Sequence, residues 1–129
     1  MKIGFIGLGN VGAKLANSLL RNKFDLTVLD IDNNILDQFK KNGAKIAINP
    51  EDLTKNVDLI ITSLPSPKIS AEIMEGENGI LKGLSKDKIW LVMSTTDDKA
   101  IKRLGNVVLI KGAGPLAGPV SGGCHRAAT

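Results

Sequence analysis

An apolar run that breaks into a glycine-rich turn opens the chain, and no other stretch constrains the fold as strongly. Residues 2–8 are nearly all apolar, the glycines of Gly7-Leu8-Gly9-Asn10-Val11-Gly12 follow, and apolar residues recur at helical spacing over 13–20. A parallel strand that turns sharply into a helix needs glycines, because side chains would obstruct the turn and keep a phosphate off the backbone. The opening therefore predicts a strand, a tight turn and a helix.

This turn has the pattern of a dinucleotide site. We expect Gly7 to make the turn, Gly9 to admit the phosphates and Gly12 to let the helix pack closely. Unpaired N–H groups and the positive end of the helix dipole would hold the anion, so the cofactor-binding set also includes Leu8, Asn10 and Val11. A purely structural loop is the alternative, and the strand before it and the helix after it favour the site.

A second candidate site residue lies at the end of the β-rich run 26–29. Asp30 directly follows this run, about twenty residues beyond the glycines, where an acid accepts hydrogen bonds from the adenosine ribose hydroxyls of a dinucleotide. A 2′-phosphate near 4 Å would meet repulsion on the order of 4 kcal/mol per charge pair, which favours NAD over NADP. Lys40 and Lys41 could approach from the next helix and offset it. An ordinary strand-end aspartate is the alternative, and Asp32 is expected to help start that helix.

Length and composition favour a single soluble domain. The 129 residues suit one domain over 1–129, and 43% of them are hydrophobic and 23% charged. No apolar run is long enough to span a bilayer, and the apolar opening is too short and too broken by glycine to be a signal peptide. We therefore expect a cytoplasmic protein without a membrane partner.

The charged and reactive side chains argue against other function classes. The net charge of +4 is spread along the chain, Tyr is absent and Trp90 is the single Trp, so nucleic-acid binding is not expected. Cys124 has no second cysteine to pair with. Cys124-His125 could bind a metal or form part of a nucleophilic dyad, but zinc needs more ligands than these two neighbours supply and the chain has no second His, so we expect neither a metal nor thiol catalysis.

The remaining pattern predicts an α/β fold, a doubly wound parallel sheet of the Rossmann type with about six strands. The strands are expected at 2–8, 26–29, 45–48, 57–64, 89–93 and 107–110. The helices are expected at 11–21, 33–41, from 50 to just before 57, from 66 to about 75, and through 97–101. Loops are expected at 76–83 and over 112–123, where Gly and Pro are too frequent for the interior of an element.

Two strand ends add candidate residues with open alternatives. The end of 57–64 should join that of the first strand, where the strand order reverses and ligands bind. Leu64 and Pro65 could border the cofactor there, or Pro65 could simply end the strand. Thr95, after the strand 89–93, could meet the nicotinamide or substrate, although capping the next helix is the commoner role of such a hydroxyl.

Two distant stretches together carry a family resemblance. The opening Ile3-Gly4-Phe5-Ile6-Gly7-Leu8-Gly9-Asn10-Val11-Gly12 and the closing Gly118-Pro119-Val120-Ser121-Gly122-Gly123 resemble the β-hydroxyacid dehydrogenases, the group that includes 3-hydroxyisobutyrate and 6-phosphogluconate dehydrogenases. Leu64-Pro65 and Met93-Ser94-Thr95 are similar to the family pattern as well. The resemblance implies a nicotinamide cofactor and hydride transfer to or from a small 3-hydroxy acid.

The resemblance further implies that Ser121, Gly122 and Gly123 hold the substrate carboxylate. A hydroxyl followed by glycine amides can form a concave set of donors suited to an anion. The family's catalytic lysine lies beyond this segment, in a helical domain, so no catalytic residue is assigned within 1–129. Little turnover is then expected from these residues alone, and a homo-oligomer or pairing with a helical domain is possible.

Two other function classes stay open. A stand-alone dinucleotide-binding module would use the same loop without catalysis. A methyltransferase that binds S-adenosylmethionine also has a glycine loop and an acid after the second strand. The complete set of glycines and the Ser-Gly-Gly segment favour the dehydrogenase.

Overall fold

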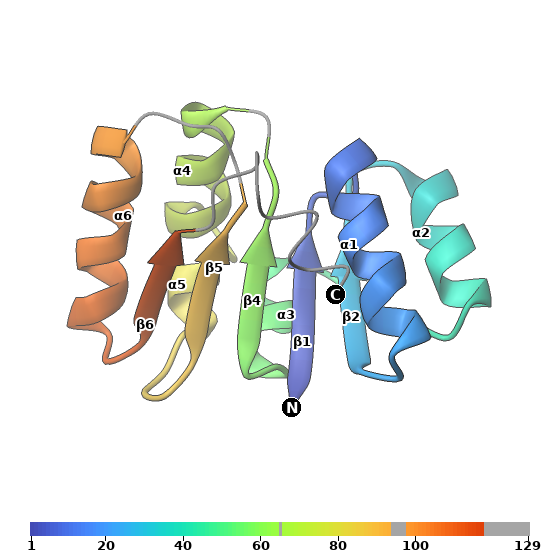
Figure 1. Ribbon diagram of the computed structural model, residues 1–129. Coiled ribbons are helices and arrows are strands. Elements are labelled where there is room, and N and C mark those ends of the chain that lie inside the picture. The colour runs from blue at the N-terminus through green and yellow to red at the C-terminus, as the bar shows by residue number, and fades with distance from the viewer. Residues whose placement is uncertain (65, 94–97, 118–129) are drawn as a thin grey trace.

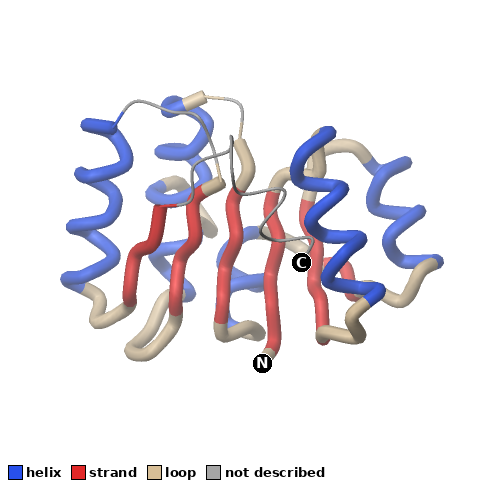
Figure 2. Tube along the Cα trace, in the orientation of Figure 1, coloured by secondary structure: helices blue, strands red, loops and turns tan. Residues whose placement is uncertain are grey.

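The chain folds into one parallel sheet with helices on both faces. A computed structural model describes residues 1–64, 66–93 and 98–117, and Figures 1 and 2 show the strands side by side with their ends aligned. The strands are β1 (Lys2–Ile6), β2 (Asp25–Leu29), β3 (Lys45–Ile46), β4 (Leu59–Thr62), β5 (Ile89–Val92) and β6 (Gly114–Ala117). The helices are α1 (Asn10–Arg21), α2 (Asn33–Lys41), α3 (Pro50–Lys55), α4 (Pro67–Glu75), α5 (Ile80–Gly83) and α6 (Asp98–Ile110).

The strand order is β3-β2-β1-β4-β5-β6, and every neighbouring pair is parallel. Phe5 of β1 lies opposite Val28 of β2 on one side and Ile61 of β4 on the other. The chain therefore moves outward from β1 in both directions, which is the doubly wound arrangement predicted from the sequence. The arrowheads of β1, β4, β5 and β6 in Figure 1 point to the same edge, and β2 runs parallel to β1, so the loops that follow β1, β2 and β4 gather there.

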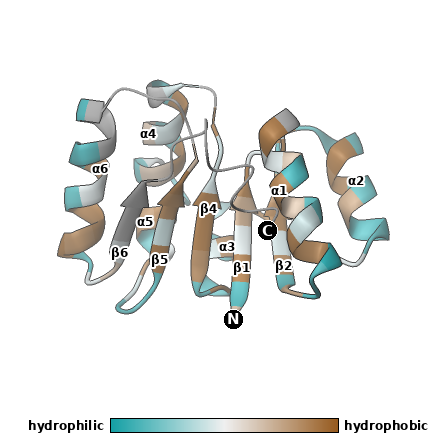
Figure 3. Cartoon of the chain, viewed as in Figure 1, coloured by the Kyte–Doolittle hydropathy of each residue, from teal (hydrophilic) through white to brown (hydrophobic). Residues whose placement is uncertain are grey.

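Each face of the sheet has its own apolar core, and Figure 3 shows β4 and β5 largely in the brown of hydrophobic residues. One core joins the sheet to α1 and α2 and includes Phe5, Val28 and Phe39. The other joins it to α3, α4, α5 and α6 and includes Ile60, Trp90 and Leu104. The buried Trp90 indole donates a hydrogen bond to the Thr62 hydroxyl at 3.0 Å, so its polar N–H is satisfied. Burial on both faces explains why the strands are nearly continuously apolar.

Side-chain caps fix the starts of three helices. The Asp32 carboxylate accepts from the Asn34 N–H at 2.9 Å, the Asn49 side chain from the Asp52 N–H at 2.7 Å, and the Ser66 hydroxyl from the Ile69 N–H at 3.2 Å. Prolines follow two of these caps at the first helical position. The structure thus confirms the predicted starts of α2, α3 and α4.

The predicted strand at 107–110 is wrong, because this run is the last turn of α6. Leu104 and Val108 are 1% and 0% exposed, whereas Leu109 and Ile110 are 57% and 84% exposed. Burial of two residues four apart, followed by two exposed apolar residues, is helical periodicity, and a short apolar run does not reveal this without its partners. Gly112, with φ +84°, follows the helix and lets the chain reverse.

The sixth strand lies instead within the segment predicted to be a loop. Gly114–Ala117 pairs in parallel with Ile89–Val92 at the end of the strand order. An edge strand has a partner on one side only, so it tolerates a proline such as Pro115 that a central strand would not. A second difference is a short helix, α5, inside the predicted loop 76–83. The observed strands β1, β3 and β4 are also shorter than their predicted ranges.

Candidate functional site

The loop between β1 and α1 is held between the two strands that flank β1. The Gly7 N–H donates to the carbonyl of Leu29, the last residue of β2, at 3.1 Å, which extends the pairing of β1 with β2 by one residue. On the other side, a Cβ at position 7 would collide with the Ser63 carbonyl after β4. Gly7 also has φ +95°, a conformation that side chains disfavour. Its expected role in the turn thus agrees with its geometry.

Gly12 and Gly9 differ in what surrounds them. A Cβ on Gly12 would collide with the Gly7 carbonyl and lie 3.2 Å from the Phe5 ring, so α1 packs against its own loop only with glycine there. Among the residues that the structure describes, none has an atom within 4 Å of a Cβ placed on Gly9, and the Gly9 backbone is extended, with φ −69°. The fold therefore does not need glycine at position 9. The open space beside Gly9 fits the approach of a ligand to the backbone, which is the role predicted for it.

The first turn of α1 offers backbone N–H groups to an anion. Gly9 is its N-cap and makes no side-chain cap hydrogen bond, and the first turn contains no acidic residue. The first N–H groups of a helix have no carbonyl partner within it, and the helix dipole places partial positive charge there. By contrast, carboxylate, amide or hydroxyl side chains cap α2, α3 and α4. The start of α1, which includes Asn10 and Val11, is thus suited to a phosphate.

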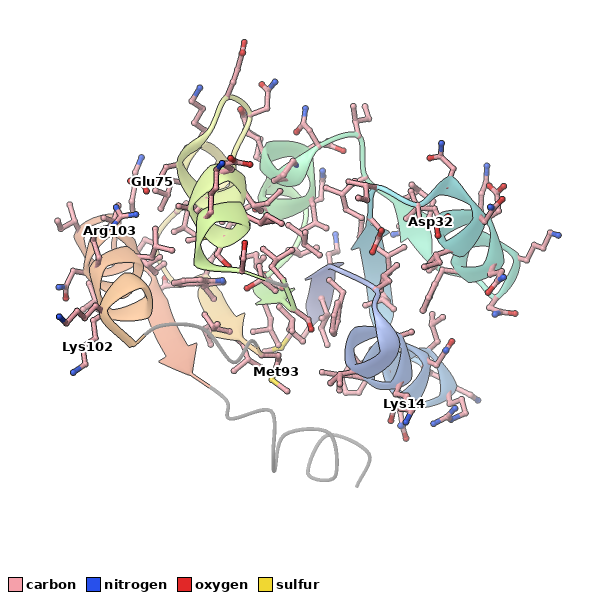
Figure 4. The ribbon with its side chains drawn as sticks, turned by 90° about the horizontal axis from the view of Figure 1, so that it is seen from above. Lys14, Asp32, Glu75, Met93, Lys102 and Arg103 are labelled. Atoms are coloured by element: carbon pink, nitrogen blue, oxygen red, sulfur yellow. The ribbon has the colours of Figure 1, made fainter. Side chains whose placement is uncertain are left out.

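Asp30 lies beside this loop, immediately after β2. Its carboxylate accepts the Leu8 N–H at 2.6 Å through Oδ2 and the Asp32 N–H at 2.9 Å through Oδ1. The sequence indicated that Asp30 ends its strand, but not that it also binds the glycine loop. Only the parallel pairing of β1 with β2 places these residues together, 22 positions apart. Figure 4, seen from above this edge, shows Asp32 beside the start of α2.

The other predicted site residues fall into two groups. Leu64 follows β4 and packs against one apolar core, and its Cδ2 would lie 3.3 Å from a Cβ on Gly7. The glycine loop, Asp30 and Leu64 are thus together at one edge. Sequence reasoning passed over Ser63, whose carbonyl faces Gly7, although its place next to Leu64 at the strand end was a usable signal. Pro65, Thr95, Ser121, Gly122 and Gly123 lie outside the described residues, as do Cys124 and His125.

The ion pairs lie apart from the glycine loop. Arg103 of α6 donates to both carboxylate oxygens of Glu75 of α4, at 2.6 and 3.0 Å, on the face opposite α1. The hydrogen bond from Arg103 lowers the pKa of Glu75, and Glu75 in turn raises the pKa of Arg103. On α3, the hydrogen bond to Glu51 raises the pKa of Lys55. These pairs fasten helices and do not form a reaction centre.

The described part of the chain contains neither a metal-binding cluster nor a membrane-spanning helix. Over 1–64, 66–93 and 98–117, no group of three or more His, Cys, Asp or Glu side chains is arranged to hold a metal ion. In those same ranges, no helix combines the length and apolar character needed to cross a membrane.

A parallel sheet whose order reverses at a glycine loop, with an acid at the end of the second strand, defines a dinucleotide-binding domain of the Rossmann type. The family model described as the NAD binding domain of 6-phosphogluconate dehydrogenase matches residues 2–129. The chain belongs to this family of NAD-binding domains.

Individual relatives agree with this assignment. The chain is 39% identical over 125 residues to the mitochondrial 3-hydroxyisobutyrate dehydrogenase of Rattus norvegicus, a match that covers 97% of this chain and 37% of that protein. Two solved structures share its fold. The 3-hydroxyisobutyrate dehydrogenase of Mycobacterium tuberculosis, described with L-serine, has a TM-score of 0.86 at 22% identity and covers 98% of this chain and 43% of that one. An imine reductase of Myxococcus stipitatus in complex with NADP+ has a TM-score of 0.84 at 18% identity and covers 92% and 40%.

The chain spans less than half the length of each of these proteins. It corresponds to the nucleotide-binding part of dehydrogenases similar to the 3-hydroxyisobutyrate enzymes.

Proposed function

We propose that the chain binds NAD at the glycine loop and serves as the cofactor domain of an enzyme that transfers hydride between the nicotinamide and a small 3-hydroxy acid. The observation that carries this proposal is the contrast between Gly9 and Gly12. Packing explains glycine at position 12, whereas no described residue lies within 4 Å of a Cβ placed at position 9. A glycine that the fold does not require, at the start of a helix without a side-chain cap, is suited to a diphosphate.

In this proposal the residues of the loop have separate tasks. The N–H groups at the start of α1, from Gly9 to Gly12, receive the diphosphate, and Leu64 and Pro65 border the cofactor on the side of β4. The Asp30 carboxylate accepts the adenosine ribose hydroxyls. It has about four acceptor positions, of which two accept backbone N–H groups in the structure, so two remain for the ribose.

The bound nicotinamide would supply the hydride acceptor or donor, and this chain would position it. Thr95 is proposed to contact the nicotinamide, and Ser121, Gly122 and Gly123 the substrate carboxylate. The solved dehydrogenase described with L-serine suggests small hydroxy acids as the compounds to try. A general acid or base at the reacting oxygen is expected outside residues 1–129.

The first test is the choice of nucleotide. We expect NADH to bind more tightly than NADPH, because a 2′-phosphate near 4 Å from Asp30 would be repelled by on the order of 4 kcal/mol per charge pair. Asp30→Ala should reduce the difference in affinity between NADH and NADPH. Isothermal titration calorimetry of wild type and variant measures both affinities. Equal binding of the two nucleotides by the wild type, or an unchanged ratio in the variant, would refute the assignment of Asp30 to the ribose.

The same titration separates the competing functions. Binding of S-adenosylmethionine but not NADH would support a methyltransferase. Binding of NADH, with no hydride transfer between the nicotinamide and any hydroxy acid even after addition of a helical domain like that of the relatives, would support a binding module without catalysis. A cytoplasmic location is a further prediction, which cell fractionation tests, since the rat relative is named as mitochondrial. A possible homo-oligomer is tested by light scattering.

A further inference from the structure

We infer that Asp30 holds the glycine loop in the conformation that receives the diphosphate, in addition to its proposed contact with the ribose. It is a positioning residue for a part of the ligand that it does not itself touch. The inference rests on the proposed function for its ligand, but its first measurement needs no ligand. It makes one carboxylate responsible for two parts of the site.

The geometry that carries this inference is a pair of hydrogen bonds. Oδ2 of Asp30 accepts the Leu8 N–H at 2.6 Å, and Oδ1 accepts the Asp32 N–H at 2.9 Å. The second bond fixes the orientation of the carboxylate relative to its own turn, so the first bond holds Leu8 at a defined position. A bond between an N–H group and a charged oxygen is about twice as strong as one between neutral groups.

The loop is also tied at neighbouring points, and Asp30 completes the set. The Gly7 N–H donates to the Leu29 carbonyl, and the Leu8 side chain is 1% exposed in the apolar core. Two successive N–H groups of the loop thus donate to residues at the end of β2. The phosphate-facing donors are therefore the later ones, at the start of α1. Their direction depends on how firmly residues 7 and 8 are held.

Removal of the carboxylate should loosen this arrangement. Without Asp30 the Leu8 N–H loses its acceptor, and one of the ties that orient the first turn of α1 is gone. Asp32 is the matched control, because it is the same residue type two positions away, and its side chain accepts the Asn34 N–H of α2 rather than a loop amide. Asp32→Ala removes the same charge and leaves the Leu8 N–H with its acceptor.

The first experiment is amide hydrogen exchange on the ligand-free protein, resolved by NMR. In Asp30→Ala the Leu8 amide should exchange at least about tenfold faster than in wild type, the equivalent of losing one charge-assisted bond. In Asp32→Ala its rate should stay within about twofold of wild type. A Leu8 rate that does not change in Asp30→Ala overturns the inference.

The second experiment separates the diphosphate from the ribose. Calorimetry compares ADP with 2′,3′-dideoxy-ADP, which keeps the diphosphate and lacks both ribose hydroxyls. We expect Asp30→Ala to weaken the dideoxy compound about three- to tenfold and ADP by a larger factor, since ADP loses the ribose contact too. Loss of ADP binding with dideoxy-ADP within about twofold of wild type would confine Asp30 to the ribose and overturn the inference.

Two provisions keep the result interpretable. If Asp30→Ala does not fold, Asp30→Asn takes its place, because the asparagine side chain has a single, neutral acceptor oxygen. The exchange rate of the Leu8 amide should then rise at least about threefold. An unchanged rate in that variant overturns the inference as well. If wild type binds neither ADP nor NADH, the proposed function fails, while the exchange of Leu8 still decides whether Asp30 holds the loop.

Discussion

At the scale of single residues, glycines in one motif have different physical reasons to be glycine. Position 7 requires glycine because its backbone is left-handed and lies close to the Ser63 carbonyl. Position 12 requires glycine because it lies close to the Gly7 carbonyl. Gly9 meets neither condition, since its φ is negative and its surroundings are open. In the sequence the three glycines are equivalent, and only their surroundings distinguish a glycine required for packing from a glycine required for ligand binding.

This difference makes opposite predictions for the same substitution. Gly9→Val should leave the domain folded, at a cost of about 1 kcal/mol for valine at the N-cap of α1, and abolish NADH binding, because the new side chain occupies the space proposed for the phosphates. Gly12→Val should lower the free energy of unfolding by roughly 1–3 kcal/mol or more through overpacking. Urea denaturation measures stability and calorimetry measures binding. If Gly9→Val still bound NADH normally, the diphosphate would have to lie elsewhere.

At the scale of elements, the prediction from the sequence and the structure differ in the last turn of α6. The run 107–110 is β-branched and apolar, which is typical of strands, yet one residue of it, Val108, is fully buried. Leu104 one turn earlier is buried on the same face. Helical periodicity over 104–108 was the available signal, and the β propensity of the run obscured it. Tertiary packing of α6 on the sheet decides the outcome.

A matched pair of leucines tests this register. Leu104→Ala should cost about 2–5 kcal/mol of unfolding free energy, because it leaves a cavity in the core. Leu109→Ala should change stability by less than about 0.5 kcal/mol, since Leu109 is 57% exposed. Chemical denaturation of both variants gives the comparison. Equal costs for the two leucines would contradict the helical assignment of this run.

The ion pair between α4 and α6 predicts a small, pH-dependent contribution. Arg103 lowers the pKa of Glu75 from its ordinary value of 4.5, so its stabilising effect is present above that value and is lost as pH falls through the lowered pKa of the folded state. Arg103→Ala should therefore lower the Tm slightly near neutral pH and not in strong acid. Because the pair is exposed, 1 M salt should reduce the difference at neutral pH. Thermal unfolding of both proteins across pH measures this, and a gap that persists in acid would rule the pair out as its cause.

At the scale of the whole molecule, the sheet order matters more than any one helix. The neighbouring positions of β2, β1 and β4 bring Asp30, the glycine loop and Leu64 to one edge. The chain spans 37% of the length of its rat relative, and the general acid or base of the proposed reaction is expected outside it. In the proposed function the domain would supply the cofactor site, and the reaction would need residues outside the domain.

The contribution of this domain to the proposed reaction can be measured directly. Residues 1–129 alone should bind NADH, yet oxidise 3-hydroxyisobutyrate or L-serine about 10²–10⁴-fold more slowly than a longer protein in which a helical domain like that of the relatives follows them, because general acid–base assistance is absent. Absorbance of the NADH formed follows the reaction. Comparable kcat values for the isolated domain and the longer protein would show that a residue within this chain carries the acid–base step.

The sequence by itself determined the fold class, the first five strands along the chain, the glycine turn and the place of Asp30 after β2. These features follow from apolar runs, helix caps and the spacing of glycines. It did not determine where β6 begins, because a short apolar run is compatible with either element until its burial is known. Nor did it reveal that Asp30 binds Leu8 or that Gly9 alone among the loop glycines has open space. Those facts depend on contacts between residues far apart in the chain, and only the parallel pairing of the strands creates them.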